Sequence, residues 1–247
     1  MFEMKKKQIE EVVLKLISEF CNLDIETCKL RYKDIKGTYN DSLSDKWYAS
    51  NCTDFAFYDT PEYLLDNLNS YFHISSRNCK IIDKVRVNDM KSIIDYAGGI
   101  GLTSIYLKEH TNKDIKYFAW SRDSLEYKFA KFMCERLDID IKFITNLENA
   151  DCILFSEVFE HMHNPIAIFS KAINIVKPQY IIHHSSFSMP AYGHYKEFDN
   201  GIGICTNKKI SKIFNANIKS HGYKVLCKGW NAIPIVYVKS RRINDNI

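Results

Sequence analysis

Hydrophobic positions follow two different spacings along the chain, and the change falls near residue 90. Between residues 4 and 20 the apolar side chains recur three and four positions apart, which predicts an amphipathic helix. A second helix is expected to begin at Pro61, because Thr60 offers a capping side chain and proline favours the first helical turn. Residues 22–58 are mixed and aromatic-rich, with a turn signal at Gly37. The N-terminal third is therefore predicted to be helical and to precede a domain of another kind.

Short apolar runs alternate with helical patterns from residue 92 onward. Such alternation indicates right-handed crossovers and a parallel sheet with helices on both faces. Near the end, two short strands joined by a turn predict an antiparallel hairpin at the sheet edge. Residues 186–206 are interpreted as a polar and aromatic loop. Strands are predicted near 92–96, 115–120, 141–145, 151–156, 179–185, 223–227 and 233–238, and helices near 101–110, 123–137, 164–176 and 207–220.

The composition is that of an ordinary soluble protein. The chain has 247 residues, of which 46% are hydrophobic and 26% charged, and its formal net charge is +4. That balance does not favour a nucleic-acid partner, which needs a concentrated basic face. No apolar stretch approaches the roughly 20 residues that span a bilayer, so no membrane partner is expected. Eight cysteines are scattered without a C-x-x-C pair, which indicates reduced thiols and a cytoplasmic location.

The segment after the first predicted strand carries the strongest chemical signal. A short apolar run ends in Asp95, and Gly98, Gly99 and Gly101 follow before the next helical pattern. A strand that turns through glycines into a helix presents bare backbone and a helix N-terminus to a ligand. In a doubly wound sheet this turn lies at the carboxyl ends of the strands, where nucleotide-like ligands bind. We therefore expect a small-molecule enzyme built around this loop.

A second motif lies downstream. Asp151-Cys-Ile-Leu-Phe-Ser-Glu157-Val-Phe-Glu160-His161 combines an acid, an apolar strand and a Glu-His segment. Together with Asp95-Tyr-Ala-Gly98-Gly99-Ile-Gly101, it makes the chain resemble class I S-adenosylmethionine-dependent methyltransferases over about residues 58–240. The resemblance implies a Rossmann-like, doubly wound α/β sheet of seven strands with a C-terminal antiparallel hairpin, preceded by a helical N-terminal extension. It divides the chain into an extension or lid over residues 1–88 and an S-adenosylmethionine-binding domain over residues 89–247.

The same resemblance implies S-adenosylmethionine as the cofactor and assigns roles to the residues that match the motifs. The acid of the first motif would orient the amino group of the cofactor. The glycines would let the backbone approach the methionine and ribose portions, and two residues after the third strand would flank the adenine. The Glu-His segment would form the wall beneath the sulfonium. The implied cofactor-binding residues are Asp95, Gly98, Gly99, Gly101, Asn146, Leu147 and Glu157.

The chain departs from the family at two positions. Ala97 replaces the first glycine of the motif, which is acceptable if its φ is negative. Ser121 stands at the end of the second strand, where the family has an acid that binds both ribose hydroxyls. Asp123 is the alternative for that role if the turn differs by one residue. Trp120 is a candidate to stack on the adenine.

Two further groups of side chains concern the cofactor lid and the substrate. Tyr58 and Tyr63 lie in a segment that resembles the helix that some of these enzymes lay over the cofactor, where an aromatic hydroxyl reaches the methionine carboxylate. The loop after the fifth strand is rich in His, Ser and Tyr and is the expected place of substrate chemistry. His194 is the first candidate for a base, because imidazole titrates near neutral pH. His161 and Tyr192 complete the candidate catalytic set.

The leading hypothesis is methyl transfer to the oxygen or nitrogen of a small molecule, with a homodimer left open. The alternative keeps the fold and uses S-adenosylmethionine itself as substrate, in a cyclisation or lysis that releases methylthioadenosine. A nicotinamide oxidoreductase is disfavoured, because Ser104 stands where its third glycine is needed. A binding subunit without activity is a further hypothesis. Glu160, His161 and His163 are of the types that ligate zinc or iron, but we expect the acid to serve a helix dipole and no metal to bind.

Overall fold

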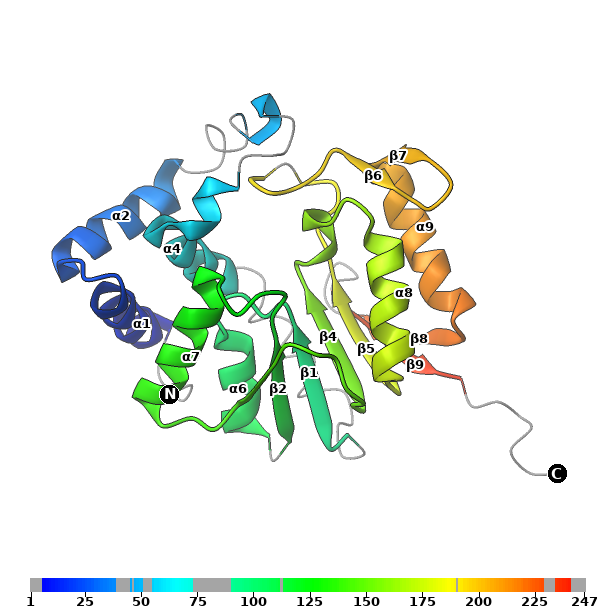
Figure 1. Ribbon diagram of the computed structural model, residues 1–247, viewed down its shortest axis with the longest axis horizontal. Helices are drawn as coiled ribbons and strands as arrows, with labels where there is room; N and C mark the ends of the chain where they lie inside the picture. The colour runs from blue at the N-terminus through cyan, green and yellow to red at the C-terminus, as the bar shows by residue number, and fades with distance from the viewer. Residues whose placement is uncertain are drawn as a thin grey trace.

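The computed structural model describes residues 6–38, 45, 47–50, 55–72, 90–111, 113–189, 191–228 and 234–240. A mostly parallel sheet forms the centre, with helices packed against it and further helices above one half of it (Figure 1). The helices are α1 (Lys6–Phe20), α2 (Ile25–Thr38), α4 (Pro61–Ser70), α6 (Leu102–His110), α7 (Leu125–Leu137), α8 (Pro165–Val176) and α9 (Asn207–Ser220), with 3-10 helices η1 (Ala56–Asp59) and η4 (Phe159–His161). The strands are β1 (Ser92–Tyr96), β2 (Asp114–Phe118), β3 (Lys142–Ile144), β4 (Cys152–Ser156), β5 (Tyr180–His184), β6 (Glu197–Asp199), β7 (Ile204–Thr206), β8 (Tyr223–Lys228) and β9 (Ile235–Lys239).

Seven of these strands form one sheet in the order β3-β2-β1-β4-β5-β9-β8. β1 pairs in parallel with β2 and with β4, and β4 pairs in parallel with β5. β9 lies antiparallel between β5 and β8. The strand order reverses between β1 and β4, and such a reversal opens the crevice in which α/β proteins bind ligands. The predicted doubly wound sheet with its reversed C-terminal pair is confirmed.

The helix α4 begins where the sequence predicts it. Thr60 accepts a hydrogen bond from the backbone N–H of Tyr63 through its side chain, and Pro61 occupies the first turn. Proline is favoured there because the first backbone N–H of a helix has no partner within the helix. One side of α4 carries Leu64, Leu65 and Leu68, which are buried against α1 and α2. The remaining face of α4 is therefore free to serve the ligand crevice.

One helix of the N-terminal part was not predicted. α2 lies within the segment interpreted as mixed, where Gly37 was taken as a turn signal. Only Cys28, Tyr32 and Ile35 carry its buried side, and charged residues fill most of the other positions. Three apolar residues at spacings of three and four are too few to distinguish a helix from an irregular segment by pattern alone. Packing against α1 and α4 stabilises α2 instead.

The N-terminal helices share their hydrophobic core with the sheet domain. Side chains of α1, α2, α4, α6 and α7 form one continuous cluster, while α8 and α9 pack with β4 and β5 in another. An ion pair joins Glu19 of α1 to Arg136 of α7. The boundary predicted between residues 88 and 89 lies at the edge of residues 73–89, outside the described part, so the division into lid and domain stays a prediction. Among the described helices, none combines the length and apolar character that a bilayer crossing requires.

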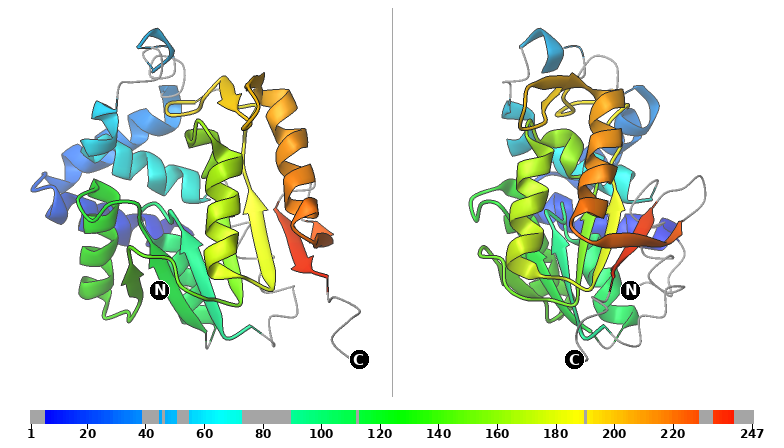
Figure 2. Two further views of the ribbon diagram at one scale, coloured as in Figure 1. Left: turned by 45° about the vertical axis from the view of Figure 1, so that its right-hand side comes forward. Right: turned by 90° about the vertical axis from the view of Figure 1, so that its right-hand side faces the viewer.

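The segment after β5 contains more structure than the predicted loop. β6 and β7 form a small antiparallel sheet that buries Phe198 and Cys205 beside α9 (Figure 2). Before it, Trp47 from the N-terminal part is fully buried and donates a hydrogen bond from Nε1 to the carbonyl oxygen of His194 at 2.9 Å. The Trp47 ring also packs on Tyr192. Two parts of the chain that are distant in sequence are thereby joined above the carboxyl ends of the strands.

Candidate active site

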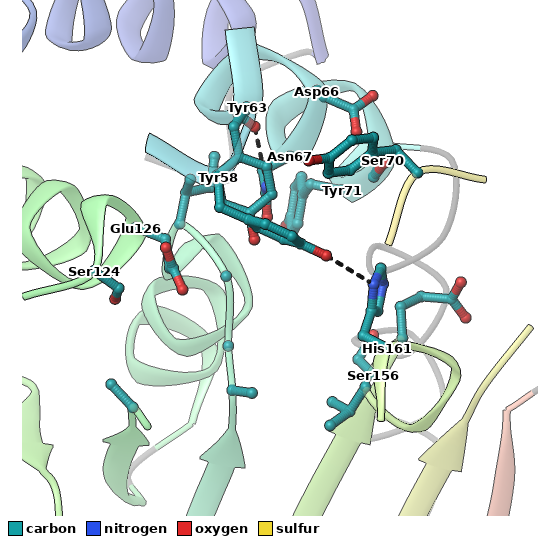
Figure 3. Close-up of a pocket in the computed structure, with 18 of the residues that line it drawn as sticks. Tyr58, Tyr63, Asp66, Asn67, Ser70, Tyr71, Ser124, Glu126, Ser156 and His161 are labelled. Carbon is teal, nitrogen blue, oxygen red and sulfur yellow. Dashed lines mark hydrogen bonds between the residues drawn. The ribbon is translucent and has the colours of Figure 1, made fainter. Parts of the chain in front are cut away.

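A cavity of about 720 Å³ lies at the carboxyl ends of β1 and β4 (Figure 3). This volume is typical of small-molecule sites, which measure roughly 300–1,000 Å³. The walls come from the loop after β1, the ends of β2 and β4, η1 with α4, and Met189, Ala191, Tyr192 and His194 after β5. Among the sequence-predicted site residues, those that line the cavity are Asp95, Gly98, Gly99, Trp120, Glu157, Tyr58, Tyr63, His161, Tyr192 and His194.

Asp95 is the buried acid at the end of β1. Its Oδ2 accepts a hydrogen bond from the Ser104 hydroxyl at 2.8 Å, whereas Oδ1 is buried and has no hydrogen-bond partner among the described residues. Burial raises the pKa of Asp95 to about 6, although the Ser104 hydrogen bond acts in the opposite direction. An unpaired carboxylate oxygen in a buried position is costly unless a donor arrives. The wall beside β1 is therefore prepared for a cationic or hydrogen-bonding ligand group.

Gly99 lies directly beneath α4. Its φ is +55°, and an added Cβ would lie 2.5 Å from Oδ1 of Asn67. Tyr117 supports the loop from below by donating its hydroxyl hydrogen to the Gly99 carbonyl oxygen at 2.6 Å. The glycine motif predicts that a ligand approaches the backbone here, and the structure shows that α4 approaches it as well. Gly101 does not line the cavity, because it packs against Ala130 of α7.

Ala97 adopts a backbone conformation that the sequence analysis did not expect. Its φ is +55°, so the negative φ required of an alanine at the first glycine position is absent. A left-handed conformation brings Cβ close to the following carbonyl oxygen and costs roughly 1–2 kcal/mol. Glu157, directly after β4, has φ +54°, and both residues line the cavity. Backbone strain is thus concentrated on two adjacent strand ends at the site.

Replacing Ala97 by glycine tests this strain. We expect Ala97→Gly to raise the free energy of unfolding by up to about 1 kcal/mol, because relief of the left-handed alanine exceeds the extra entropy that glycine gains in the unfolded chain. Chemical denaturation with unchanged slope measures the difference. A loss of stability on this substitution would show that Ala97 is not strained. Gly203→Ala is the matched control, since an added Cβ there meets nothing within 4 Å and no left-handed φ is involved.

Of the residues predicted to bind the ribose and the adenine, only some line the cavity. Trp120 lines the cavity and is 53% exposed, so a ring face is accessible there. Ser121, Asn146 and Leu147 do not line the cavity. The Ser121 hydroxyl instead accepts a hydrogen bond from the backbone N–H of Asp123, at an exposed turn. The end of β2 therefore presents an aromatic ring and no carboxylate at the expected position.

A carboxylate enters the same side of the cavity from the next helix. Glu126 lies in the first turn of α7 and lines the cavity together with Ser124. Figure 3 shows both residues across the cavity from His161. Burial raises the pKa of Glu126 above its usual value. The sequence analysis missed this residue, because an acid in a first helical turn is the ordinary partner of the helix dipole and carries no distinct signal.

Aromatic rings form the upper wall of the cavity. Tyr58 packs edge-to-face against Tyr63 with ring centroids 4.8 Å apart, and Phe57 packs on Tyr192 at the same separation. Tyr58 and Tyr192 are also in contact, with centroids 5.6 Å apart. The two tyrosines predicted as lid contacts are thus brought together with the loop after β5. Such a wall excludes water and offers ring faces to a ligand.

The two candidate histidines are neighbours. The His161 ring lies edge-to-face on the His194 ring with centroids 4.6 Å apart, and the Tyr58 hydroxyl lies 3.3 Å from Nδ1 of His161. Burial lowers the pKa of His161 to about 4, with a further contribution from His194, so this imidazole is neutral at pH 7. The His194 Nδ1 lies 2.7 Å from the carbonyl oxygen of Met189. Because a carbonyl only accepts, Nδ1 carries the hydrogen, and in the neutral ring the lone pair is on Nε2.

Gly193 makes this arrangement sterically possible. An added Cβ at this position would overlap the Tyr58 hydroxyl and lie 2.7 Å from Nδ1 of His161. Its φ is +79°, which also favours glycine. The loop after β5 therefore reaches the tyrosine and the histidine with its bare backbone.

A buried carboxyl pair lies under the histidines. Burial and the neighbouring Glu160 raise the pKa of Glu157 well above its usual value. Glu157 Oε1 lies 3.2 Å from Nε2 of His184 and accepts a hydrogen bond from Ser186 at 3.1 Å. Glu160 Oε1 accepts from the Ser186 backbone N–H at 2.7 Å. This network fixes the wall formed by the end of β4.

The alternative metal site finds no support in the geometry. Within the part of the chain that the structure describes, no three His, Cys, Asp or Glu side chains are gathered as metal ligands would be. His163, which the motif placed beside Glu160, packs its ring on Tyr195.

Comparison with known proteins shows distant likenesses. No protein-family model matches the sequence, and no curated protein is significantly similar to it. Among solved structures, the small RNA methyltransferase HEN1 is 16% identical, with a TM-score of 0.49 over 68% of this chain and 26% of that one. An O-methyltransferase from a Brevibacillus brevis trans-AT polyketide synthase multienzyme, in complex with S-adenosyl-L-homocysteine, is 12% identical, with a TM-score of 0.37 over 44% of this chain and 40% of that one. The [4+2]-cyclase SpnF is 14% identical, with a TM-score of 0.43 over 62% and 59%.

These likenesses carry no argument about activity at such identities and TM-scores. This chain also spans less than two thirds of the length of each of the three proteins named. The fold itself is a Rossmann-like, doubly wound sheet of seven strands with a reversed C-terminal pair, as the resemblance implies. The activity has to be argued from the cavity.

Proposed function

We propose that the protein is an S-adenosylmethionine-dependent methyltransferase acting on a small molecule. The observation that supports this most is Asp95, which lines the cavity at the β1–β4 switch point and whose Oδ1 is buried without a partner among the described residues. An ammonium group is the strongest donor for such an oxygen, and the methionine part of the cofactor carries one. The residues present therefore fit this cofactor.

Three side chains would hold the cofactor in this proposal. Asp95 would bind its ammonium group, and Trp120 would offer its exposed ring to the adenine. Glu126 would take the ribose hydroxyls, since a carboxylate accepts two hydrogen bonds and Ser121 does not line the cavity. The cofactor supplies a methyl group on a sulfonium leaving group, so the protein needs chiefly to align the acceptor and exclude water.

The histidines would handle the proton of the acceptor. His194 lines the cavity and, in its neutral form, has its lone pair on Nε2, so it can take a proton from a hydroxyl or an amine. His161 is neutral at pH 7 and positions the Tyr58 hydroxyl beside the same space. The aromatic wall of Phe57, Tyr58 and Tyr192 keeps water out.

The sulfur-containing compound that is formed from S-adenosylmethionine tests the proposed reaction. We expect incubation with S-adenosylmethionine to give S-adenosylhomocysteine only when a small-molecule extract supplies an acceptor, with mass spectrometry as the readout. Methylthioadenosine formed without any acceptor would instead establish the cyclase or lyase alternative. If S-adenosylhomocysteine does not bind at all in a calorimeter, both versions fail.

His194→Gln is expected to lower the rate at least about a hundredfold while the cofactor still binds, because general-base catalysis contributes roughly that much.

A further inference from the structure

The cofactor as proposed leaves one polar group of the cavity without a role. Asp66, Asn69 and Ser70 lie on the last two turns of α4 and line the cavity. Positions three and four apart on a helix are neighbours, so these side chains form one cluster, which we call the α4 subsite. Figure 3 shows Asp66 and Ser70 above His161, across the cavity from Ser124 and Glu126. The α4 subsite thus lies apart from Glu126, the carboxylate that would bind the ribose.

The α4 subsite has acceptors that lack donors. Oδ1 of Asn69 is buried and has no hydrogen-bond partner among the described residues. The Asp66 carboxylate has neither a hydrogen bond nor a salt bridge within that same part of the chain, and burial raises its pKa to about 7. A carboxylate and an amide oxygen both accept hydrogen bonds. A ligand that satisfies them must therefore donate, and a positively charged donor does so best.

The charges along the described lining of the cavity also favour a positively charged ligand. Its described lining includes no Lys or Arg, and burial keeps His161 neutral at pH 7. Within the described lining, a phosphate group or a nucleic-acid end would meet five acidic side chains and no compensating Lys or Arg. The carboxylates that line the cavity are Asp59, Asp66, Asp95, Glu126 and Glu157.

The aromatic wall adds a second attraction for a cation. Tyr58, Tyr63 and Tyr192 line the cavity, and the Tyr58 ring contacts the rings of both other tyrosines. Aromatic ring faces attract ammonium groups, and more strongly when water is excluded. Polar acceptors on α4 and ring faces on η1 and the loop after β5 therefore surround one space.

We propose that the acceptor substrate is a small amine whose ammonium group binds to Asp66 and Asn69 in the α4 subsite. The proposal rests on the proposed function and concerns recognition of the ammonium group, whichever atom receives the methyl group. Asp66 acts in it as the specificity-determining residue. The same arrangement disfavours anionic acceptors and the phosphate backbone of a nucleic acid.

Binding of matched amines tests the proposal. Calorimetry of the full chain saturated with S-adenosylhomocysteine would compare tyramine with its neutral isostere p-propylphenol and with p-hydroxyphenylpropionate. The aliphatic series butylamine, butanol and butyrate would be measured in the same way. In at least one series we expect the amine to bind tenfold or more tightly than its neutral counterpart, and the carboxylate not to bind. If no amine is preferred in either series, or if a short single-stranded RNA binds more tightly, the proposal is wrong.

Two substitutions separate the α4 subsite from the cofactor site. Asp66→Asn should abolish the amine preference while the affinity for S-adenosylhomocysteine changes less than threefold. Glu126→Gln should do the reverse, weakening S-adenosylhomocysteine while the amine preference persists in the saturated protein. Asp140→Asn, whose side chain is fully exposed, should change neither. An amine preference that survives Asp66→Asn overturns the assignment of the subsite. Wild-type protein that fails to bind S-adenosylhomocysteine overturns the proposed function instead.

Discussion

Gly99→Val is expected to weaken the binding of S-adenosylhomocysteine by at least about a hundredfold, or roughly 2.7 kcal/mol. Valine is β-branched, and φ +55° is a genuine outlier for such a residue. Its Cβ would also lie 2.5 Å from Oδ1 of Asn67, so the Asn67 side chain of α4 must move away from the loop after β1. Both effects displace the wall that we propose binds the methionine part. Titration calorimetry measures the affinity directly.

The controls for this variant distinguish lost binding from lost folding. Far-ultraviolet circular dichroism and thermal unfolding should show that Gly99→Val retains the sheet, because the substitution affects the loop and α4 and not the strands. Gly99→Ala should fall between wild type and valine, since it has the same φ but only one methyl group. Gly203→Ala should bind normally. Wild-type affinity in a folded Gly99→Val protein would remove the loop from the cofactor site.

Affinity for S-adenosylhomocysteine is expected to fall about tenfold between pH 7 and pH 5. The pKa of Asp95 in the ligand-free protein is raised to about 6, mainly by burial. An ammonium ligand binds the ionised carboxylate, which is the dominant form at pH 7 and a minor form at pH 5. Affinity therefore follows the ionised fraction downward as the pH falls. Asp95→Asn should bind weakly and lose this dependence, and a wild-type profile flat from pH 5 to pH 7 would contradict the assignment.

The same pKa has the opposite consequence for the ligand-free protein. An acid whose pKa is raised on folding binds its proton more tightly in the folded state, so stability falls as the pH rises from 3.8 toward 6. Ionised Asp95 is then a continuing cost at pH 7. Asp95→Asn should accordingly be more stable than wild type at pH 7 without ligand. Denaturation at pH 4 and pH 7 would show this difference shrinking at the lower value.

The central sheet could be predicted because its signals are local. β1, the turn through Gly98 and Gly99, and α6 follow one another within twenty residues, and each has its own pattern of apolar spacing or small residues. The cap of α4 is likewise carried by Thr60 and Pro61 alone. The predicted strands and the helices after residue 92 accordingly lie within about three residues of the observed ones.

The upper half of the cavity could not be predicted, because it depends on contacts between distant segments. Asp66 and Glu126 read as ordinary exposed helix acids until α4 and α7 are placed beside the loop after β1. The left-handed φ of Ala97 has no signal in the sequence either, since alanine avoids that conformation. β6 and β7 are only three residues long, too short for alternation to distinguish them from a loop.

Gly193 has a consequence for the order in which the molecule assembles. Its backbone lies against Tyr58 of η1 and His161 of η4, so the upper wall of the cavity needs three segments that are distant in sequence to be in place. Contacts between residues so distant in sequence carry a large loop-closure entropy and form late in folding. By the same reasoning, the contacts of the upper wall should break before those of the sheet when the protein unfolds. Backbone amides of residues 191–194 should then exchange with solvent faster than those of β1 and β4, and a ligand that bridges α4 and His161 should slow that exchange.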